Sequence, residues 1–313
     1  MSETTTIPAT PETVKHGFFD AGLAPAARIA SGDTVILETL SGEVADLPDD
    51  VSMHLLPEHR AVAEQAERGP GPHFLTGPVH VEGAEAGDVL QVDILDVALR
   101  QNWGWNVSKP LIGTLPEDFP NFRRTHLPID RQAGIVTLPW GTELALRPFF
   151  GIMAVAPPTN WGRITSVIPR AHGGNMDNKE LVAGTTLYLP VFNEGALFVA
   201  GDGHGVQGDG EVCLTALETS LRGTFRLTAR KDLSFDRPRA ESGDWIMTMA
   251  FDEDLDDAAK TALRDMIAWI VERRGISADD AYMLCSLACD LRVTQTVDGN
   301  KGIHAVLAKT ALA

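Results

Sequence analysis

Residues 87–95 read GDVLQVDIL, a turn-forming pair followed by an alternating apolar run. Glycine and aspartate favour turns, because glycine adopts backbone conformations closed to other residues and the aspartate side chain bonds the backbone nearby. In the run that follows, Leu90, Val92 and Ile94 share one face of an extended chain, and polar side chains alternate with them. The stretch therefore predicts a turn that leads into a β-strand with one buried face.

The same pattern recurs along the chain. Gly32-Asp33 precedes TVILETL, and Gly243-Asp244 precedes WIMTM. Three further runs have a similar strand-like composition: TLYLPV (186–191), GALFVAG (195–201) and GTFRLTA (223–229). Many short strands separated by turn residues are typical of a sandwich or a barrel, so we expect a mainly β fold.

Helices are expected mainly in the C-terminal part. Over 256–274 apolar residues recur at helical spacing, acidic residues crowd the start, and Gly275 follows two arginines. Ser277 stands three residues before an aspartate, which predicts the start of a second helix over 277–289. A short third helix is expected near 58–68.

Composition limits the partners and the compartment. Asp+Glu 43 against Lys+Arg 26 gives a formal net charge of −17, which disfavours nucleic acid and anionic lipid and suits capture of a cation. No uninterrupted apolar stretch approaches the length of about 18 residues that a membrane helix needs, so we expect no membrane association. Three sparse cysteines do not make a disulfide framework, which favours a cytoplasmic protein.

No linker-like change of composition divides the chain. We therefore expect one integrated unit over 1–313, with 233–290 partly helical. A homo-oligomer is expected because most soluble oligomeric enzymes assemble from identical subunits. The segment 103–128 holds four prolines and two tryptophans, which favours a long excursion rather than a core element. It is interpreted either as a surface loop or subunit contact, or as a lid over a site.

The densest polar cluster is GDGHGVQGDGE, residues 201–211. In an extended chain Asp202 and His204 share a face. Asp209 and Glu211 are also two apart and share a face under the same condition. The intervening glycines let the backbone pass close to a ligand, and carboxylates with imidazole suit zinc, manganese or a similar divalent ion. The sequence predicts a metal site here, against the simpler interpretation of a solvated acidic turn.

Two motif interpretations of this cluster are excluded. Gly203, Gly205 and Gly208 spell GxGxxG, but a dinucleotide-binding loop is followed by a helix. Here acidic residues and the strand-like run VCLTAL (212–217) follow instead. An EF-hand loop requires oxygen ligands where His204 and Gly205 stand.

Two other stretches carry candidate ligands. In PRAHGGNMDNKEL (169–181), Asn175 and Asp177 share a face if the chain is extended. His73 and His80 flank a Thr-Gly-Pro turn, and His73 is the stronger candidate of the two. The competing interpretations are a loop that bonds its own backbone and half-buried polar residues.

A side-chain nucleophile is poorly supported. The chain has no GxSxG motif. Cys213 lies two residues after Glu211, but CLTAL is interpreted as a buried strand in which cysteine acts as a small hydrophobe. Cys285 and Cys289 are four apart on the second expected helix and are expected to pack.

At these residues the chain resembles the acetamidase/formamidase family of amide hydrolases. The GGNMD and GDGH–QGDGE pieces are its most specific motifs, and the resemblance touches most of the chain in order. The matching stretches are HGFFDAGLAPAARIASGDTVILET (16–39), LTGPVHVEGAEAGDVLQVDILDV (75–97), HGGNMDNKELVAGTTLYLPVFNEGALFVAGDGHGVQGDGE (172–211) and DLRVTQTVDGNKGIHAVL (290–307).

The resemblance implies hydrolysis of short linear amides, of the formamide or acetamide type, to a carboxylate and ammonia. It implies a jelly-roll-like β-sandwich with additional β-barrel-like and small α/β portions. It also implies a divalent metal ion, with zinc as the first candidate and calcium or another divalent ion as alternatives. Carried over position by position, the site candidates are Asp177, Asp202, His204 and Glu211, with His73 behind them.

Our mechanistic hypothesis is that Glu211 carries a proton from water to the leaving nitrogen while the other three candidates hold the ion. Glu211 as a further ligand stays open. Asn175 and Gln207 are the candidate substrate-binding residues. Two alternatives are kept: a non-catalytic sandwich that binds carbohydrate or a structural ion, and a related enzyme that cleaves a larger or cyclic C–N compound. For the second, Trp103 and Trp105 would supply an aromatic wall.

Overall fold

The Gly-Asp pairs precede strands, as the sequence predicts. In the computed structural model, which describes residues 3–313, Gly87 has a φ of +97° and leads into β8 (Val89–Leu99). Gly32, at +96°, leads into β5 (Thr34–Glu38). Positive φ is readily adopted only by glycine, so these two glycines set the turns that start the strands.

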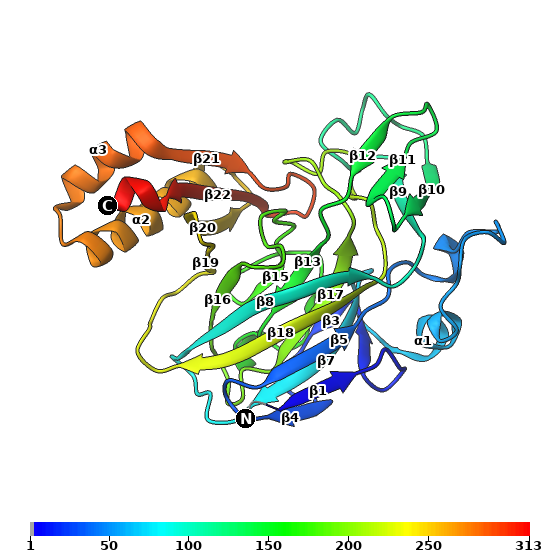
Figure 1. Ribbon diagram of the computed structural model, residues 1–313, viewed down its shortest axis with the longest axis horizontal. Coiled ribbons are helices and arrows are strands. Elements are labelled where there is room, and N and C mark those ends of the chain that lie inside the picture. The colour runs from blue at the N-terminus through cyan, green and yellow to red at the C-terminus, as the bar shows by residue number, and fades with distance from the viewer. Residues whose placement is uncertain (1–2) are drawn as a thin grey trace.

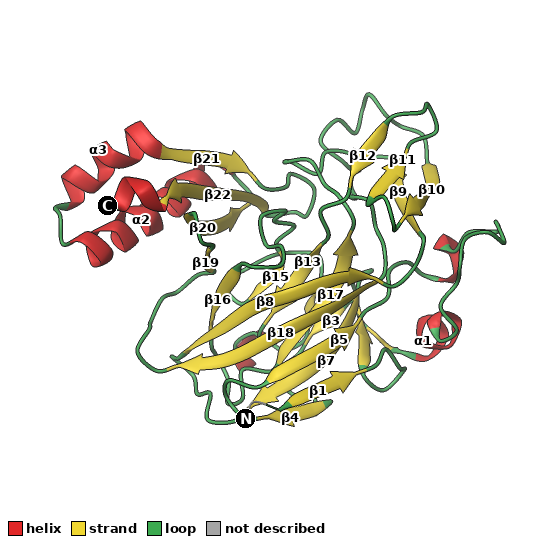
Figure 2. Ribbon diagram, viewed as in Figure 1, coloured by secondary structure: helices red, strands yellow, loops and turns green. Residues whose placement is uncertain are grey.

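Two large sheets contain most of the strands (Figure 1, Figure 2). The nine-stranded sheet is mixed, because β1 pairs with β5 in parallel while its other pairs are antiparallel. From edge to edge it consists of β1 (Thr4–Ile7), β5, β18 (Leu221–Arg230), β8, β16 (Thr186–Pro190), β19 (Arg239–Glu241), β20 (Trp245–Asp252), β22 (Lys301–Ala308) and β21 (Cys289–Val293).

The seven-stranded sheet carries the strands that reach the polar clusters. Its order is β15 (Gly173–Asn175), β13 (Phe149–Ala154), β17 (Phe198–His204), β7 (Phe74–Val81), β2 (Val14–His16) and β6 (Glu67–Arg68), with β4 (Ala27–Ile29) paired to β7. A two-stranded sheet of β3 (Phe18–Phe19) and β14 (Ile164–Thr165) accompanies it. The run expected at 195–201 begins at Phe198 and continues through His204, so the first part of the polar cluster belongs to a strand.

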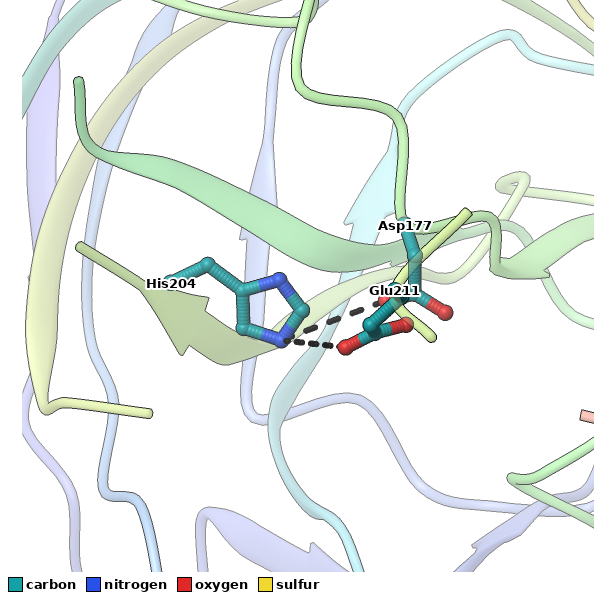
Figure 3. Close-up of side chains that lie close together, drawn as sticks. All are labelled: Asp177, His204 and Glu211. Carbon is teal, nitrogen blue, oxygen red and sulfur yellow. Dashed lines mark ion pairs between the residues drawn. The ribbon is translucent and has the colours of Figure 1, made fainter. Parts of the chain in front are cut away.

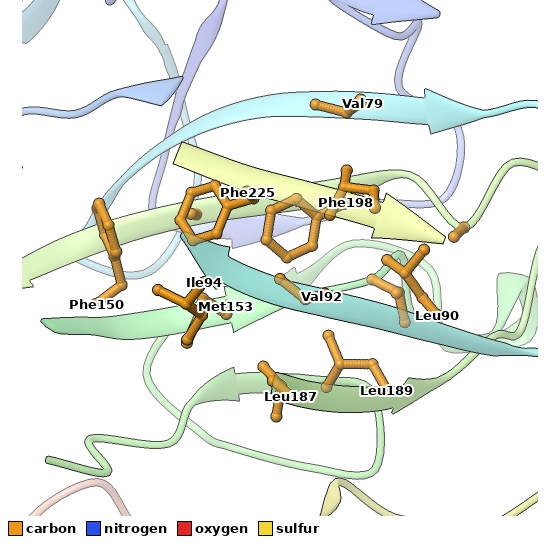
Figure 4. Packing of buried hydrophobic residues seen from close by; sticks show 14 of the residues in the cluster. Val79, Leu90, Val92, Ile94, Phe150, Met153, Leu187, Leu189, Phe198 and Phe225 are labelled. Atoms are coloured by element: carbon orange, nitrogen blue, oxygen red, sulfur yellow. The ribbon is translucent and has the colours of Figure 1, made fainter. Parts of the chain in front are cut away.

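The main hydrophobic core lies between the two large sheets (Figure 4). Phe225 of β18 packs against Phe150 of β13 and Phe198 of β17, with ring centroids 5.4 and 5.5 Å apart. Leu90, Val92 and Ile94, the residues predicted to share a buried face, all belong to this core. Each fully buried side chain of this kind contributes about 1.5–3 kcal/mol. The predicted β-sandwich is confirmed.

The predicted C-terminal helices are confirmed. Helix α2 (Leu255–Arg274) starts at Asp254, whose side chain accepts the amides of the first turn, and ends at Gly275 with a φ of +66°. Helix α3 (Ala278–Ala288) starts at Ser277, whose side chain accepts the Asp280 amide. Both pack against the β20–β22 end of the nine-stranded sheet, where a second apolar cluster forms. Cys289 lies at the start of β21, so its expected place on the helix is wrong, but both it and Cys285 of α3 pack in this cluster as expected.

The remaining helices are short, and one of them was expected. Helix α1 (His59–Gln65) occupies the segment predicted near 58–68. In the part of the chain that the structure describes, 3₁₀ turns are found at η1 (Val44–Asp46), η2 (Thr159–Trp161) and η3 (Lys309–Leu312). Within residues 3–313, no helix combines the length and the apolar character needed to cross a membrane.

The interpretation of 103–128 as an excursion is partly wrong. Strands β9 (Trp103–Ser108) and β10 (Arg123–Asp130) pair in antiparallel fashion and continue into β11 (Ile135–Thr137) and β12 (Glu143–Ala145). Only 109–122 is a connection between strands, and three of the four prolines lie in it. Trp103 is fully buried, and its indole Nε1 donates to the His54 carbonyl at 3.0 Å.

Candidate metal centre

Three neighbouring strands of the seven-stranded sheet bring the predicted residues together. Asp202 and His204 lie on β17, whose His204 is paired with Phe149 of β13. Asp177 follows β15 on the other side of β13, and its amide donates to the Gly151 carbonyl at 3.1 Å. Residues 25 or more positions apart in sequence thus meet at one end of the sheet.

The His204 imidazole lies at the middle of the cluster. Its Nε2 is 3.2 Å from Asp202 Oδ2 and 3.1 Å from Glu218 Oε1. The same nitrogen is 4.0 Å from Asp177 Oδ1 and 3.9 Å from Glu211 Oε1 (Figure 3). All five residues are buried, with exposed fractions of 8% or less. Four carboxylates therefore face a single ring nitrogen out of contact with bulk water.

Gly151 leaves open the space between these groups. A Cβ atom at this position would lie 2.5 Å from Asp177 Oδ1, 2.5 Å from Asp202 Oδ2 and 2.9 Å from His204 Cε1. Any larger residue would push the carboxylates apart. Asp177, which follows β15, can therefore meet Asp202 and His204 of β17 only because Gly151 of the intervening strand β13 has no side chain.

Gln207 fixes the orientation of the His204 ring. Its amide nitrogen donates to the Asp177 carbonyl at 2.7 Å, so its oxygen is the atom that lies 2.9 Å from His204 Nδ1. An amide oxygen accepts, which assigns the Nδ1 hydrogen to this bond. In the neutral ring Nε2 then carries a lone pair directed at the carboxylates, as a metal ligand requires.

Three of the acids have strained backbones. The φ angles of Asp177, Asp202 and Glu211 are +49°, +55° and +46°. Left-handed conformations are uncommon for residues other than glycine, although aspartate adopts them more readily than most. Such strain persists where the surrounding structure imposes it and gathers at functional sites. Asp202 and His204 are therefore brought together by a distorted strand rather than by regular alternation.

The carboxylates have little counter-charge in the protein beyond the His204 ring. Within residues 3–313, neither oxygen of Asp177 has a hydrogen-bond partner. Burial, together with the Asp298 and Asp202 carboxylates, raises the pKa of Asp177 well above its usual range. Burial and the Asp177 carboxylate do the same to the pKa of Glu211. Buried acids become this hard to ionise when too little positive charge compensates them.

His204 and its two nearest acids form a coupled group. Burial opposes ionisation of His204, but Glu218 and Asp202 raise its pKa well above the usual value. Against the effect of burial, His204 and His73 lower the pKa of Asp202. Burial raises the pKa of Glu218 to about 7. The imidazole alone is too little positive charge for this number of acids.

A divalent cation fits this set of donors. Two sets of closely spaced ligand atoms share the His204 ring: Asp177, His204 and Glu211, and Asp202, His204 and Glu218. The separations of 3.1–4.0 Å from Nε2 bracket the roughly 3.3–3.6 Å between ligand atoms around a tetrahedral ion with bonds of about 2.0–2.2 Å. One nitrogen with several carboxylate oxygens is a donor set for zinc, manganese and related ions.

Two acidic residues at this site escaped the sequence analysis. Glu218 lies in the run after the glycine-rich cluster, and its Oε1 also accepts the Ala216 amide at 3.0 Å. Asp298 lies between β21 and β22, is 5% exposed, and its carboxylate is next to that of Asp177. Burial raises the pKa of Asp298 as well. A single acid within the apolar run ALETSL was the only local sign of Glu218.

The expected pairing of Asp209 with Glu211 on one face is wrong. Residues 209–217 form turns rather than a strand, so the alternation does not apply. Glu211 is buried, whereas Asp209 is exposed and pairs with Lys179 at 3.0 Å. The strand expected for CLTAL is absent from the described chain for the same reason, and Cys213 is half-buried beside Asn106.

The other candidates lie around the centre. His73 is half-buried, its Nδ1 lies 2.8 Å from the Ser166 hydroxyl, and burial lowers its pKa while Asp202 opposes that effect. Asn175 on β15 is buried, and its Oδ1 has no partner within 3–313. His80 lies against Gly195, away from the cluster. His73 and Asn175 thus border the candidate centre without belonging to the two ligand sets.

A large cavity opens beside Glu211. Its volume is about 870 Å³, and Glu211 and Gln207 contribute to its wall. The connection 109–122, strands β9 to β12 and the 206–217 turns line it, and it is open to solvent. The segment that the sequence left open as a lid therefore lines the cavity next to the candidate centre. Neither Trp103 nor Trp105 is among its lining residues, so the expected aromatic wall is wrong, and Trp140 lines it instead.

Comparison with known proteins agrees on one family. A sequence profile of the Acetamidase/Formamidase family matches residues 9–163 and 161–309. The formamidase of Methylophilus methylotrophus is 34% identical over 45% of this chain and 47% of its own length. The matched part spans about half the length of each curated relative.

Solved structures match over nearly the whole chain. The acetamidase of Bacillus halodurans is 32% identical, with 97% of each chain covered and a TM-score of 0.85. The acetamidase of Yersinia enterocolitica is 29% identical, with 100% of this chain and 94% of that chain covered and a TM-score of 0.87.

Proposed function

The chain belongs to the acetamidase/formamidase family, and from this premise we propose that it hydrolyses the C–N bond of linear amides to a carboxylate and ammonia. One observation carries the proposal: Asp177, Asp202, His204 and Glu211 meet in a buried cluster whose acids have too little positive charge around them. Formamide and acetamide are the first substrates to test.

We propose that Asp177, Asp202 and His204 hold a divalent ion, with His73 as a further candidate ligand beside Glu218 of the second ligand set. Zinc is the first candidate, because it accepts mixed nitrogen and oxygen ligands, and calcium or another divalent ion is the alternative. When bound, such an ion polarises a carbonyl and lowers the pKa of water from 15.7 toward about 7. The Gly151 space and the unpartnered Asp177 oxygens support this assignment.

Glu211 is assigned the proton transfer. Its carboxylate lies on the border between the buried cluster and the cavity, within reach of both. A raised pKa suits a group that accepts a proton from water and then gives it to the departing nitrogen. The water oxygen adds to the carbonyl carbon, the C–N bond breaks, and the nitrogen leaves as ammonia.

Two amide side chains support these groups. Gln207 positions the ring of His204, a proposed metal ligand, and it also lines the cavity, where it would face the substrate. Asn175 is proposed to bind the substrate amide through its unpartnered Oδ1.

We further propose that residues 1–313 act as one cytoplasmic enzyme unit and as a homo-oligomer. Asp298, from the C-terminal part of the chain, reaches the same site as Asp177, which supports a single unit.

Ammonia release from formamide and acetamide by the purified protein tests the proposal. Glu211→Gln is expected to keep the bound metal and to lower turnover by about 10²–10⁴-fold, because the proton transfer is lost. Glu194→Gln, the same change at an exposed glutamate outside the cavity lining, is the matched control and should behave as wild type. If metal content and turnover fall together in Glu211→Gln, the residue is a ligand.

Two other outcomes reject the proposal itself. Full activity after complete removal of divalent ions would take the metal out of the mechanism. A protein that releases no ammonia from any amide, yet still binds an ion or a carbohydrate, would be the non-catalytic sandwich instead.

A further inference from the structure

We propose that the cavity beside Glu211 holds the acyl group of the substrate and that this group is bulky, apolar and uncharged. The inference rests on the proposed amide hydrolysis. Its first ground is size: the cavity measures about 870 Å³, in the range of about 300–1,000 Å³ that suits drug-sized ligands. Acetamide, whose acyl group ends in one methyl, leaves nearly all of that space unfilled.

The second ground is the chemistry of the wall. Large apolar side chains from three separate parts of the chain line the cavity. Ile112, Leu115 and Phe119 come from the connection 109–122, Trp140 and Leu144 from the β11–β12 turn and β12, and Val212 from the turn after Glu211. These six side chains are 38–69% exposed. A single exposed apolar residue is ordinary, but a gathering of this size marks a surface that contacts something else.

The third ground is continuity with the reacting groups. Glu211 and Gln207 line the cavity and also contact the buried cluster around His204. A substrate whose amide reaches His204 and Glu211 therefore has its remaining atoms in the cavity. The apolar wall begins directly beyond these two polar residues, at Val206 and Val212.

The charged residues of the cavity wall indicate which acyl groups the cavity accepts. Three acids, Asp118, Asp209 and Glu211, line the cavity, against one basic residue, Arg123. A substrate whose acyl group carries a carboxylate would meet net repulsion in this space. Uncharged primary amides with an aliphatic or aryl group are the class that fits.

Steady-state ammonia release from acetamide, butanamide, hexanamide and phenylacetamide tests the inference. Each methylene buried in the cavity is expected to raise kcat/KM by up to about fourfold. We expect hexanamide and phenylacetamide to exceed acetamide by at least about tenfold. A value of kcat/KM that stays flat or falls with acyl length overturns the inference.

Variants separate the cavity from the reacting groups. Phe119→Ala and Trp140→Ala are expected to lower kcat/KM for hexanamide by about 5–20-fold and to leave acetamide within about twofold. Tyr282→Ala on helix α3 is the matched control, because Tyr282 is 59% exposed, close to the 61% of Phe119, and lies outside the cavity. Equal losses on both substrates would overturn the inference.

A second copy of the chain is the competing occupant of the cavity. If Phe119→Ala or Trp140→Ala changes the sedimentation mass and not the selectivity, that copy covers the cavity and the inference is wrong. If wild type releases no ammonia from any of the four amides, the proposed function fails first. If acetamide is hydrolysed but longer amides are not preferred, only the acyl assignment fails. Should a variant not fold, the wild-type chain-length series decides alone.

Discussion

The buried cluster around His204 and the cavity beside it lie on either side of Glu211 and are built in opposite ways. The cluster holds polar side chains on strands and strained residues, away from water and without enough partners. The cavity presents apolar side chains on turns and connections, in contact with water. Each region keeps side chains in an unfavourable environment, and in both cases a bound group would relieve it: a cation in the first, an apolar acyl chain in the second.

The difference also concerns tolerance to change. Strands β13 and β17 fix the positions of the cluster, where a single added methyl clashes with two carboxylates. The 109–122 connection carries much of the cavity wall, and connections accept substitution more readily than sheets do. The reaction is therefore expected to be rigidly specified, while the range of acyl groups is adjustable.

The largest effect is expected from Gly151→Ala. The new Cβ would lie 2.5 Å from the Asp177 and Asp202 carboxylates, so the acids must move apart and the metal site is lost. Acetamide turnover should fall by about 10³-fold or more, with loss of bound metal, since the water nucleophile depends on it. Gly243→Ala, with no described atom within 4 Å of the added Cβ, is the control. Near-normal metal content and turnover in Gly151→Ala would argue against a shared site.

A smaller effect is expected from Gln207→Leu. The variant removes the acceptor of the His204 Nδ1 hydrogen, so the ring loses its fixed tautomer and orientation. Partners of this kind change metal affinity or activity by about 10–100-fold when removed. Titration of the metal-free variant with zinc, followed by ammonia assays, measures both effects. An unchanged metal affinity would show that Gln207 serves the substrate alone.

The smallest effect is on thermal stability as a function of pH. Raised pKa values mean that Asp177, Glu211, Glu218 and Asp298 stabilise the metal-free fold when protonated. For Glu218, this contribution is fully present below its unfolded pKa of about 4.3 and is lost as pH rises through about 7. Asp202, whose pKa is lowered, works in the opposite direction, but only near and below its unfolded pKa of about 3.9. Buried histidines such as His172 and His304, whose pKa values burial lowers to about 3 and about 4, also oppose the acids, but their effect is complete once pH exceeds their unfolded pKa of about 6.5.

We therefore expect the Tm of metal-free protein to fall by about 4 °C or more between pH 7.0 and pH 8.5. Added divalent ion should restore most of that loss at pH 8.5, because it stabilises the ionised acids. Phe119→Ala, in the cavity wall, should show the same pH dependence as wild type. A metal-free Tm that rises over this range would contradict the assignment of unbalanced buried acids.

Strands, helices and part of the site could be predicted from short stretches of sequence. Gly-Asp turns located β5, β8 and β20, and helix α2 was recognisable from its apolar face and its ends. The resemblance of GGNMD and GDGH to known amidases indicated Asp177, Asp202 and His204, which do meet. These predictions needed only neighbouring residues or motifs.

Features set by distant contacts were missed. Asp298 has no metal-binding neighbour in sequence and reaches the site only because the β21–β22 connection folds against Asp177. The alternation argument failed at Asp209 because Glu211 has a left-handed backbone that turns the chain. In 103–128 three of the four prolines lie in one connection. The number of prolines therefore led us to expect an irregular segment where β9 and β10 flank that connection.

The most direct test of the central claim is a crystal of the protein soaked with zinc and measured at the zinc absorption edge. We predict an anomalous difference peak about 2.0–2.2 Å from His204 Nε2 and from oxygens of Asp177 and Asp202. Contradiction would come from a fully active crystal preparation with no peak in that space, or with its ion bound elsewhere on the chain.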